Sequence, residues 1–498
     1  MKFLLDTNIF IPLEPSAIGE VHPRSEAAAS LLRLLVEGGH QYYVHPELKT
    51  DLSRDRDLER QRQREVVRAK YPVLRAVPNA PESWKRLVGD PAPRTNDWVD
   101  IAHLAAVYHD AVDYLVTEDL RLRRKSRRVD LGERVVSVDE AISIVRFLYV
   151  EQPAPPPAVK SLKAYELTEA DPIFDSLRVD YPSFDQWLRK CKREHRDAWV
   201  ILGADRRYAA VAIVKQEQVP NEAALQGRIL KISTFKVSQV YGGFKYGELL
   251  LKSILGYCYS NRFDALYVTA FPKHVGLLTL LEDFGFERRA ARTKMGEYIY
   301  TKPLAPTAEE EAAANPLDFH IKYGPPALKL LPGFVFVVPI QPVYHRMLFP
   351  DAEYVGDASD SVQLSLVESQ PFGNAIKKAY LCQSPSRLLQ PGACLLFYRS
   401  HDRHAISVVG VAESTLVSSR VDVIARFVGK RTLYNIQQID RMCARREVLA
   451  ILFRQDRLLD VPLVIDELVS QGVLVRPPQS ITRVPREATE WLEQRLTG

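Results

Sequence analysis

Short apolar runs alternate with amphipathic segments over the first 150 residues of the chain. Apolar runs typical of strands lie at 2–5, 41–44, 114–117 and 135–138. The spacing of apolar residues between them predicts helices at 25–37, which a Gly-Gly pair ends, and at 97–109. Strands that alternate with helices in this way predict a parallel sheet in a three-layer α/β/α domain.

Two proline-containing stretches, 151–157 and 303–316, predict linkers and divide the chain into domains at 1–150, 160–305 and 316–498. The middle segment mixes strands and helices, as an α+β domain does. The last segment carries short apolar strands at 334–338, 393–398, 405–411 and 448–453, whose spacing predicts a small β-barrel, followed by helices at 456–470 and 486–496. The fold class expected is therefore multidomain, α/β and α+β.

Composition adds limits to this picture. The 498 residues are 46% hydrophobic and 26% charged, ordinary values for a globular protein. The net charge of +5 permits a nucleic-acid partner without requiring one. Five cysteines without a CxxC pair predict free thiols in a reducing compartment. No apolar run is as long as a membrane span and no secretion signal opens the chain, so we expect a cytoplasmic protein.

Aspartates recur at the ends of the predicted elements of the first domain. Asp6 ends the first strand, Asp119 follows a later one, and Asp51 and Asp100 lie on predicted helices. The carboxyl ends of parallel strands share one edge of a sheet, so Asp6 and Asp119 are expected to lie close together. Acids gathered in one pocket would hold Mg²⁺ or Mn²⁺ and activate water for phosphodiester hydrolysis. Taken singly, each acid is also explained as a helix cap or a solvated charge, as Asp97 is.

The motifs around these acids resemble the PIN domain, over residues 1–150. The resemblance rests on the segments 4–8 (LLDTN), 100–106 (DIAHLAA) and 115–119 (LVTED). It implies a metal-dependent ribonuclease that leaves a 5′-phosphate and a 3′-hydroxyl, of a class that commonly serves as a toxin or in RNA processing. The RNA-related modules that follow suggest a structured RNA, tRNA among others, as substrate. Whether an antitoxin or other protein is a partner stays open. The catalytic and metal-binding residues would be Asp6, Asp51, Asp100 and Asp119, and Thr7, Asn8 and Thr117 would orient them and the substrate.

Basic clusters near the acids fit a nucleic-acid substrate, because phosphate backbones are bound mainly by Lys and Arg. Residues 121–128 carry only basic charge, and Arg121, Arg123 and Arg124 are the predicted RNA contacts. Residues 54–70 mix acids with bases and are equally explained as a solvated helix face.

The middle segment contains a strand at 231–237, a glycine-containing turn at 241–247 and a helix at 248–259. Free N–H groups and the positive end of a helix make such a turn a phosphate cradle. The arrangement resembles the GNAT acetyltransferases over 160–305. The resemblance implies acetyl-CoA as cofactor, bound by Val237, Gly242, Gly243, Lys245 and Gly247.

The segment also departs from the GNAT pattern. Lys245 replaces a glycine of the loop, where it would add positive charge near a pyrophosphate. Leu281 replaces a tyrosine that many members use as general acid, which weakens the case for acetyl transfer more than the case for the fold. His274 replaces a common asparagine, and by itself is expected to be a capping or surface residue. Tyr298 and Tyr300 are expected in the core.

The last segment resembles the PUA-like fold of ASCH and EVE domains, which bind RNA or modified nucleotides. The resemblance rests on the strands at 392–397 and 448–453, with 373–378 as a loose echo of a motif. Arg399, Lys430 and Arg431 are candidate phosphate contacts, with plain solvated charges as the alternative.

Together these features predict a metal-dependent ribonuclease coupled to an acetyl-CoA-binding module and an RNA-binding module. One alternative makes the acetyltransferase the enzyme, acting on RNA, aminoacyl-tRNA or protein, with the PIN-like domain as a scaffold. A second alternative is a non-catalytic RNA adaptor. Loss of RNA cleavage in Asp6→Asn, with acetyl transfer intact, would separate the first two. The pattern does not indicate the oligomeric state.

Overall fold

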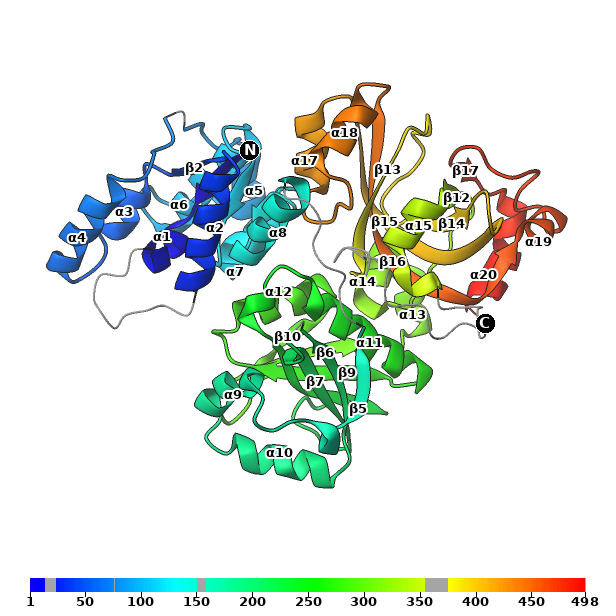
Figure 1. Ribbon diagram of the computed structural model, residues 1–498, viewed down its shortest axis with the longest axis horizontal. Helices are drawn as coiled ribbons and strands as arrows, with labels where there is room; N and C mark the ends of the chain where they lie inside the picture. The colour runs from blue at the N-terminus through cyan, green and yellow to red at the C-terminus, as the bar shows by residue number, and fades with distance from the viewer. Residues whose placement is uncertain (14–23, 76, 150–157, 204, 354–374, 498) are drawn as a thin grey trace. The chain divides into compact units, whose positions relative to one another are not determined.

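The structure, a computed structural model, describes residues 1–13, 24–75, 77–149, 158–203, 205–353 and 375–497 (Figure 1). The chain forms two compact units. The first contains Met1–Glu151 together with Ala425–Lys430, and the second contains Gln152–Ile424 with Arg431–Gly498. The predicted linker at 151–157 and the first two residues of the 373–378 motif lie outside the described residues.

A four-stranded parallel sheet forms the centre of the first unit, in the order β2-β1-β3-β4. The strands are β1 (Lys2–Leu5), β2 (Gln41–Val44), β3 (Tyr114–Val116) and β4 (Val135–Val136), and the helices are α1 (Thr7–Leu13), α2 (Ser25–Glu37), α3 (Leu48–Leu52), α4 (Leu58–Arg68), α5 (Trp84–Val88), α6 (Asn96–Tyr108), α7 (Leu120–Arg128) and α8 (Val138–Tyr149). The helix predicted at 97–109 is thus present one residue earlier, and the helix predicted at 25–37 has those bounds.

Both faces of this sheet are covered. Leu4 of β1 packs in one core with Leu104 of α6 and Leu122 of α7. Its neighbour Phe3, which points to the opposite face, is also fully buried and contacts the ring of His40, which in turn contacts Tyr149 at the end of α8. The domain therefore has the three layers that alternating strands and helices predict.

A short segment from late in the chain completes this unit. Arg426 forms an ion pair with Asp110 at 2.9 Å, and the Lys430 ammonium donates to the carbonyl of Gly132 at 2.8 Å. The hydroxyl of Tyr114 donates to the carbonyl of Arg426 at 3.0 Å. Lys430, a candidate phosphate contact, is thus bound to backbone carbonyl oxygens of the protein itself.

The second unit contains a seven-stranded sheet in the order β10-β11-β9-β8-β7-β6-β5, in which only the β8–β9 pair is parallel. The strands are β5 (Lys160–Lys163), β6 (Asp197–Leu202), β7 (Tyr208–Glu217), β8 (Ile229–Val237), β9 (Ala265–Ala270), β10 (Glu287–Arg292) and β11 (Tyr298–Pro303). The helices are α9 (Asp175–Asp180), α10 (Phe184–Arg193), α11 (Tyr246–Ser260) and α12 (Val275–Asp283), with 3₁₀ turns η1 (Ala164–Glu166), η2 (Pro172–Phe174) and η3 (Gln239–Tyr241).

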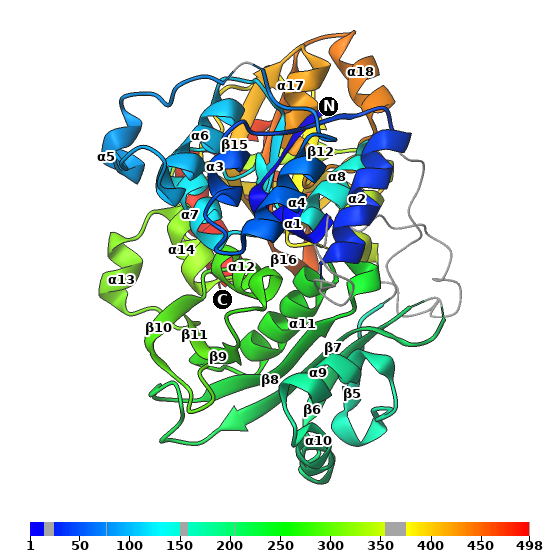
Figure 2. The ribbon, with the colours of Figure 1, turned by 90° about the vertical axis from the view of Figure 1, so that its left-hand side faces the viewer.

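Helices cover both faces of this mixed sheet. Helix α11 packs across β6, β7 and β8 (Figure 2). On the other face, Leu188 and Cys191 of α10 share a core with Val200 of β6 and Val211 of β7. The sheet therefore leaves uncovered its two edges, β10 and β5, and the ends of its strands.

A six-stranded sheet, also in the second unit, has the order β13-β16-β15-β14-β12-β17. The strands are β12 (Val335–Ile340), β13 (Lys377–Cys382), β14 (Cys394–Arg399), β15 (Ala405–Ser418), β16 (Val448–Val464) and β17 (Thr482–Arg483). The helices are α13 (Ala308–Ala313), α14 (Pro316–Tyr323), α15 (Pro342–Leu348), α17 (Val421–Val428), α18 (Ile436–Cys443), α19 (Ile465–Ser470) and α20 (Thr489–Thr497), with 3₁₀ turns η4 (Pro350–Glu353) and η5 (Arg486–Ala488).

Two expectations for this last segment need correction. In the pairings of the described residues, β13 and β17 are edge strands, so these pairings do not close the sheet into the predicted barrel. Residues 456–464, predicted as helix, continue β16, because they pair with β15 past several register shifts. Among the helices of the described residues, none combines the length and the apolarity needed to cross a membrane.

Candidate functional site

The two parallel strands of the seven-stranded sheet separate toward their carboxyl ends. Ile229–Ile232 of β8 pair with β9, and no further β9 pairing is present in the described part of the chain. β8 continues to Val237, and there its pairing is with β7 on the other side. Backbone N–H and C=O groups on the β9 side of this stretch are therefore available to an extended ligand, which can pair with them as a strand would.

The glycine-containing turn after β8 leads directly into the first turn of α11. Gly243 has φ 85° and Lys245 has φ 61°, so the turn uses the left-handed region twice. No side chain of the N-cap residue Lys245 bonds the first amides of α11, and helix geometry leaves those amides without intrahelical partners. These amides and the positive end of a fifteen-residue helix suit a phosphate group.

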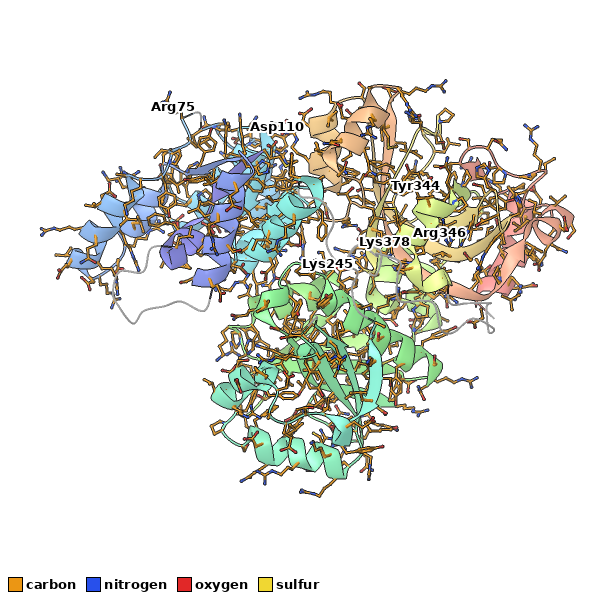
Figure 3. All side chains as sticks on the ribbon, viewed as in Figure 1. Arg75, Asp110, Lys245, Tyr344, Arg346 and Lys378 are labelled. Carbon is orange, nitrogen blue, oxygen red and sulfur yellow. The ribbon has the colours of Figure 1, made fainter. Side chains whose placement is uncertain are left out.

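Lys245 was expected to add positive charge near a bound pyrophosphate, and the structure does not support this expectation. The left-handed backbone at this position explains why a glycine suits the turn. Lys245 is labelled in Figure 3. Its ammonium, however, lies 3.3 Å from the carboxylate of Glu248, which is only 5% exposed. The predicted extra positive charge for a pyrophosphate is therefore largely neutralised within the first turn of α11.

Gly247 lets α11 approach the sheet closely. A Cβ atom at this position would lie 3.0 Å from the Leu280 side chain of α12 and 3.9 Å from Val237 of β8. A larger side chain would push the start of α11 away from the carboxyl end of β8. Of the predicted acetyl-CoA contacts, Val237, Gly243, Lys245 and Gly247 thus lie on one strand–turn–helix segment, and Gly242 donates its N–H to Gln239 within the turn.

A charged cluster lies at the carboxyl ends of β8 and β9. Asp180, the last residue of α9, has a side chain that is 9% exposed. Its carboxylate lies 3.2 Å from Nε2 of His274, in the loop between β9 and α12, and it also forms an ion pair with Lys273. His274 occupies the N-cap position of α12 and is partly exposed, but its side chain makes no capping hydrogen bond.

The protonation state of His274 suits proton transfer. Burial lowers the pKa of His274 below its ordinary value, while Asp180 acts in the opposite direction. The imidazole is therefore neutral at neutral pH. With Nε2–H directed at Asp180, the lone pair is on Nδ1, and this nitrogen has no hydrogen-bond partner among the described residues. An Asp–His pair of this kind can accept a proton from a substrate.

Lys236 of β8 adds a cation on the same side of the sheet as Asp180. It follows the last β8–β9 pair and is opposite Val211 of β7. Burial lowers the pKa of Lys236, and the charge of Asp180 opposes that shift. Lys236 forms no ion pair within the described ranges, so its ammonium remains available to an anionic group at the opening.

Aromatic and acidic side chains enclose the cluster. The hydroxyl of Tyr181, next to Asp180, donates to Glu297 at 2.6 Å, and Glu297 is 7% exposed. The Tyr181 ring packs on Phe271 with centroids 5.3 Å apart, and Phe271 packs on His274. These contacts fix the loop that carries His274.

The other residues singled out in this segment are structural. Leu281 is 1% exposed in the core, so it has no chemistry to offer in place of a tyrosine. Tyr300 is fully buried and donates to Glu282 at 2.9 Å. Tyr298 is only partly buried and lies under two arginines, so the core prediction is right for Tyr300 and wrong for Tyr298.

In the first unit, Asp6 is held by three donors. The amide of Thr7 donates to Oδ1 at 2.7 Å, and Asn8 Nδ2 and Thr117 Oγ1 donate to Oδ2 at 2.7 and 2.6 Å. The hydroxyl of Thr7 donates to Asp51 at 2.7 Å, which ties the second acid to the first. Hydrogen bonds from Thr7, Asn8 and Thr117 therefore set the positions of two of the four predicted acids.

Protein cations and amides hold the remaining acids. Lys125 lies 2.7 Å from Asp100 and 2.6 Å from Asp97. Asp119 accepts from the amides of Arg121 and Leu122 and so caps α7. Asp97 is not the cap of α6, because Thr95 occupies that position.

The four acids share one electrostatic environment. Burial, together with the charges of Asp51 and Asp119, raises the pKa of Asp6 to about 6, although hydrogen bonds from Thr117 and Thr7 oppose the shift. Burial also raises the pKa of Asp100 to about 6, where Lys125 opposes the shift. Behind Asp6, His103 is 1% exposed, and burial lowers its pKa to about 4, so it adds no positive charge at neutral pH.

These side chains do not fit the predicted metal ion in this arrangement. No set of three or more His, Cys, Asp or Glu side chains in the described ranges could hold a metal. The Lys125 ammonium takes the place beside Asp100 that a cation would need, and Asp119 is directed at α7. Proximity of Asp6, Asp51, Asp100 and Asp119 is thus present, whereas shared ligation is not.

The three predicted RNA contacts of this unit differ in their exposure to solvent. Arg123 is 5% exposed and forms an ion pair with Glu140 at 2.8 Å, so its prediction as an RNA contact is wrong. Arg121 is exposed and Arg124 is partly buried. In α4, Arg60 and Arg64 pair with Asp55, as expected for a solvated helix face.

The candidate phosphate contacts of the last segment are already paired. Arg399 is 4% exposed and bonds Asp402 at 2.6 Å. Arg431 pairs with the buried Glu413, and Arg454 completes that triad. Arg399 and Arg431 are therefore unsuited to bind phosphate, and the alternative prediction of solvated charges is also wrong, because both side chains are buried.

Asp180 is the residue of this candidate site that sequence reasoning missed. It lies 94 residues before His274 and carries no motif of its own. The one feature in the sequence that could have drawn attention to Asp180 is its position at the end of a helix, directly before Tyr181 and Pro182. Only the crossing of α9 over the strand ends brings it to His274.

Comparison with known proteins gives partial likenesses. No protein-family model matches the chain, and no curated protein matches it. Among solved structures, the ASCH protein from Zymomonas mobilis is 15% identical, covering 32% of this chain and 95% of that chain with a TM-score of 0.25. A GNAT acetyltransferase from Staphylococcus aureus Mu50 is 12% identical, covering 30% and 100%, with a TM-score of 0.24. A variant of the toxin AtaT, bound to the C-terminus of the antitoxin AtaR and acetyl-CoA, is 10% identical, covering 29% and 93%, with a TM-score of 0.23. Each likeness concerns about a third of the chain and does not establish a function.

Proposed function

We propose that the second unit is an acyl-CoA-dependent N-acyltransferase, with His274 as the base that takes the proton of the acceptor amine. The observation that carries this proposal is the position of the Asp180–His274 pair at the carboxyl ends of β8 and β9, where these strands separate. The turn before α11 leaves the sheet at this same end, because it follows β8. Cradle, strand opening and base thus converge on one end of the sheet.

The residues fit acetyl-CoA as a bound group. Val237, Gly243 and Gly247 would border it, the first amides of α11 would face its phosphates, and the unpaired backbone of β8 would bond its extended arm. When bound, acetyl-CoA supplies a thioester whose carbonyl carbon an amine attacks, so that a carbon–nitrogen bond forms and the carbon–sulfur bond breaks.

His274 and Lys236 supply what the chain adds to that chemistry. Nδ1 of His274 accepts the proton that the amine loses on attack, and Asp180 stabilises the imidazolium that results. Lys236 places positive charge at the opening, where it favours the negative charge that develops on the carbonyl oxygen or the departing sulfur. The tyrosine used as general acid elsewhere has no counterpart at Leu281.

The test is transfer of radiolabelled acetyl groups from acetyl-CoA to three acceptor pools: total RNA, aminoacylated tRNA and protein. The full-length chain should label one pool, and His274→Ala should lose that label while still binding acetyl-CoA. Absence of transfer to every pool, or full transfer by His274→Ala, would contradict the proposal.

A second candidate, hydrolysis of RNA phosphodiesters in the first unit, is favoured by the acid cluster. Asp6 and Asp100 have pKa values raised to about 6, and carboxyl groups that titrate near the working pH suit general acid–base catalysis. Incubation of the protein with total RNA in Mn²⁺, Mg²⁺ or EDTA, followed by end mapping, tests this candidate. Cleavage that is lost in Asp6→Asn supports it, and no cleavage under any of the three conditions excludes it.

A further inference from the structure

The β10–β11 hairpin presents the most exposed basic surface near the proposed active site. All six residues of β10 are exposed, on an edge strand of the seven-stranded sheet. Within this strand and the turn after it, Arg288, Arg289, Arg292 and Lys294 are all exposed. We call these four residues the basic hairpin.

The charges of the basic hairpin are not neutralised by the protein. None of its four side chains forms an ion pair in the described ranges, in contrast to the arginines of α4. Two of them are instead arranged on an aromatic ring: the guanidinium carbons of Arg288 and Arg292 lie 4.8 and 4.7 Å from the ring centroid of Tyr298. Stacking on one ring holds both guanidinium groups in place while leaving their N–H groups available.

The basic hairpin is adjacent to the proposed base. Arg292 is opposite Tyr298 in the β10–β11 pairing, and Tyr298 is opposite Ala270, the last residue of β9. His274 follows only four residues after Ala270. The neighbouring residue Glu297 bonds Tyr181, next to Asp180, so the hairpin and the cluster are directly linked.

We propose that the basic hairpin binds the phosphodiester backbone of RNA and so presents an acceptor amine carried on RNA to His274. Planar guanidinium groups match phosphate geometry, and several unpaired cations in a row match the regular charge of a polynucleotide. The position of this surface at the site rests on the proposed acyltransferase, but RNA binding itself can be measured without acetyl-CoA.

Edge protection is the alternative explanation of these arginines, since charged side chains on an edge strand oppose pairing with another chain. That role needs charge of either sign and no ring to order it. Two guanidinium groups stacked on one tyrosine therefore favour a ligand.

The experiment measures binding of a fluorescein-labelled 20-nucleotide RNA of mixed sequence to the full-length chain by fluorescence anisotropy over a range of salt concentrations. The double variant Arg288→Glu/Arg292→Glu should bind at least about tenfold more weakly, and the slope of log K against log salt should shrink by about 1.4, two phosphate contacts at about 0.7 each.

The matched control is Arg189→Glu/Arg193→Glu on α10. These arginines are exposed, have no ion pair in the described ranges and lie on a helix that packs on β6 and β7, at the far side of the sheet from β10. The same change of charge there should leave RNA affinity within about twofold. Circular dichroism of both variants checks that they are folded.

Three results would overturn the proposal. The first is unchanged RNA affinity in the hairpin variant, and the second is an equal loss of affinity in the α10 variant. The third is an identical salt slope in all three proteins, which would show that the RNA binds a different surface. RNA binding that follows the prediction while acetyl transfer fails for every acceptor would instead refute the acyltransferase and leave the RNA surface standing.

Discussion

The acid cluster of the first unit and the histidine site of the second unit are opposites in how their charges are balanced. In the first, each acid already has a partner from the protein: Thr7, Asn8, Thr117, Lys125 or the start of α7. In the second, Lys236 and Nδ1 of His274 have no such partner in the described part of the chain. A site whose groups bond one another needs no ligand, whereas unused groups beside an open strand edge indicate one.

The comparison also shows that motif strength and site geometry are different kinds of evidence. The segments around Asp6, Asp100 and Asp119 are the sharpest motifs of the chain, yet they form no shared metal site among the residues that the structure describes. The segment around His274 departs from the GNAT pattern that it resembles, yet the structure places Asp180 beside this histidine. Function is therefore argued from the site and not from the motif.

The largest effect should follow removal of the base. His274→Ala should lower kcat for acetyl transfer by about 10²–10⁴, because a positioned general base contributes that much. Binding of acetyl-CoA should change little, since His274 lies at the acceptor end. Asp6→Asn serves as the control in the other unit and should leave transfer unchanged. Equal loss in both variants would remove the distinction between the sites.

The pH dependence of transfer sharpens the assignment of His274. The base must be neutral, and its pKa is lowered from 6.5, so kcat/KM should rise with pH along a limb whose midpoint lies below 6.5. Asp180 raises this pKa, so Asp180→Asn should move the midpoint to still lower pH. A limb with its midpoint at or above 7, or one unmoved by Asp180→Asn, would assign the proton to another group.

A smaller effect should test the internal balance of the acid cluster. Lys125→Met leaves Asp100 without its cation, so the raised pKa of Asp100 should rise further. A carboxyl group with a raised pKa binds its proton more tightly in the folded state, so stability falls as pH rises from about 4 through the folded-state pKa. We expect a loss of about 1–3 kcal/mol at pH 8, discounted because the pair is partly exposed, and a smaller loss at pH 5.

Peptide-resolved hydrogen exchange of α6 and β3, corrected for the intrinsic rate at each pH, measures this loss within the first unit. Lys85→Met is the matched control, because its ion pair with Glu82 is exposed, and it should cost little at either pH. Equal destabilisation by Lys125→Met at both pH values would show that packing, and not charge, is the role of Lys125.

The fold was largely predictable from local patterns, and the site was not. Periodicity placed the four strands of the first unit and its helices α2 and α6, because both faces of its parallel sheet bury apolar side chains, but it did not place α1, α5 or α8. It failed at 456–464, where an alternating segment long enough for a helix pairs with β15 instead. The contacts of Asp180 with His274, and of Lys430 with Gly132, join segments 94 and 298 residues apart. Such contacts depend on how elements cross, which no local pattern encodes.

The central claim is that β8, β9 and the start of α11 form an acyl-CoA site, and calorimetric titration of the full-length chain with acetyl-CoA tests it most directly. We predict one acetyl-CoA per chain, loss of at least about tenfold in affinity in Gly247→Leu, where a side chain meets Leu280, and unchanged affinity in Gly256→Ala, where a Cβ in the same helix meets nothing within 4 Å. No binding by the unaltered protein, or full binding by Gly247→Leu, would contradict the account.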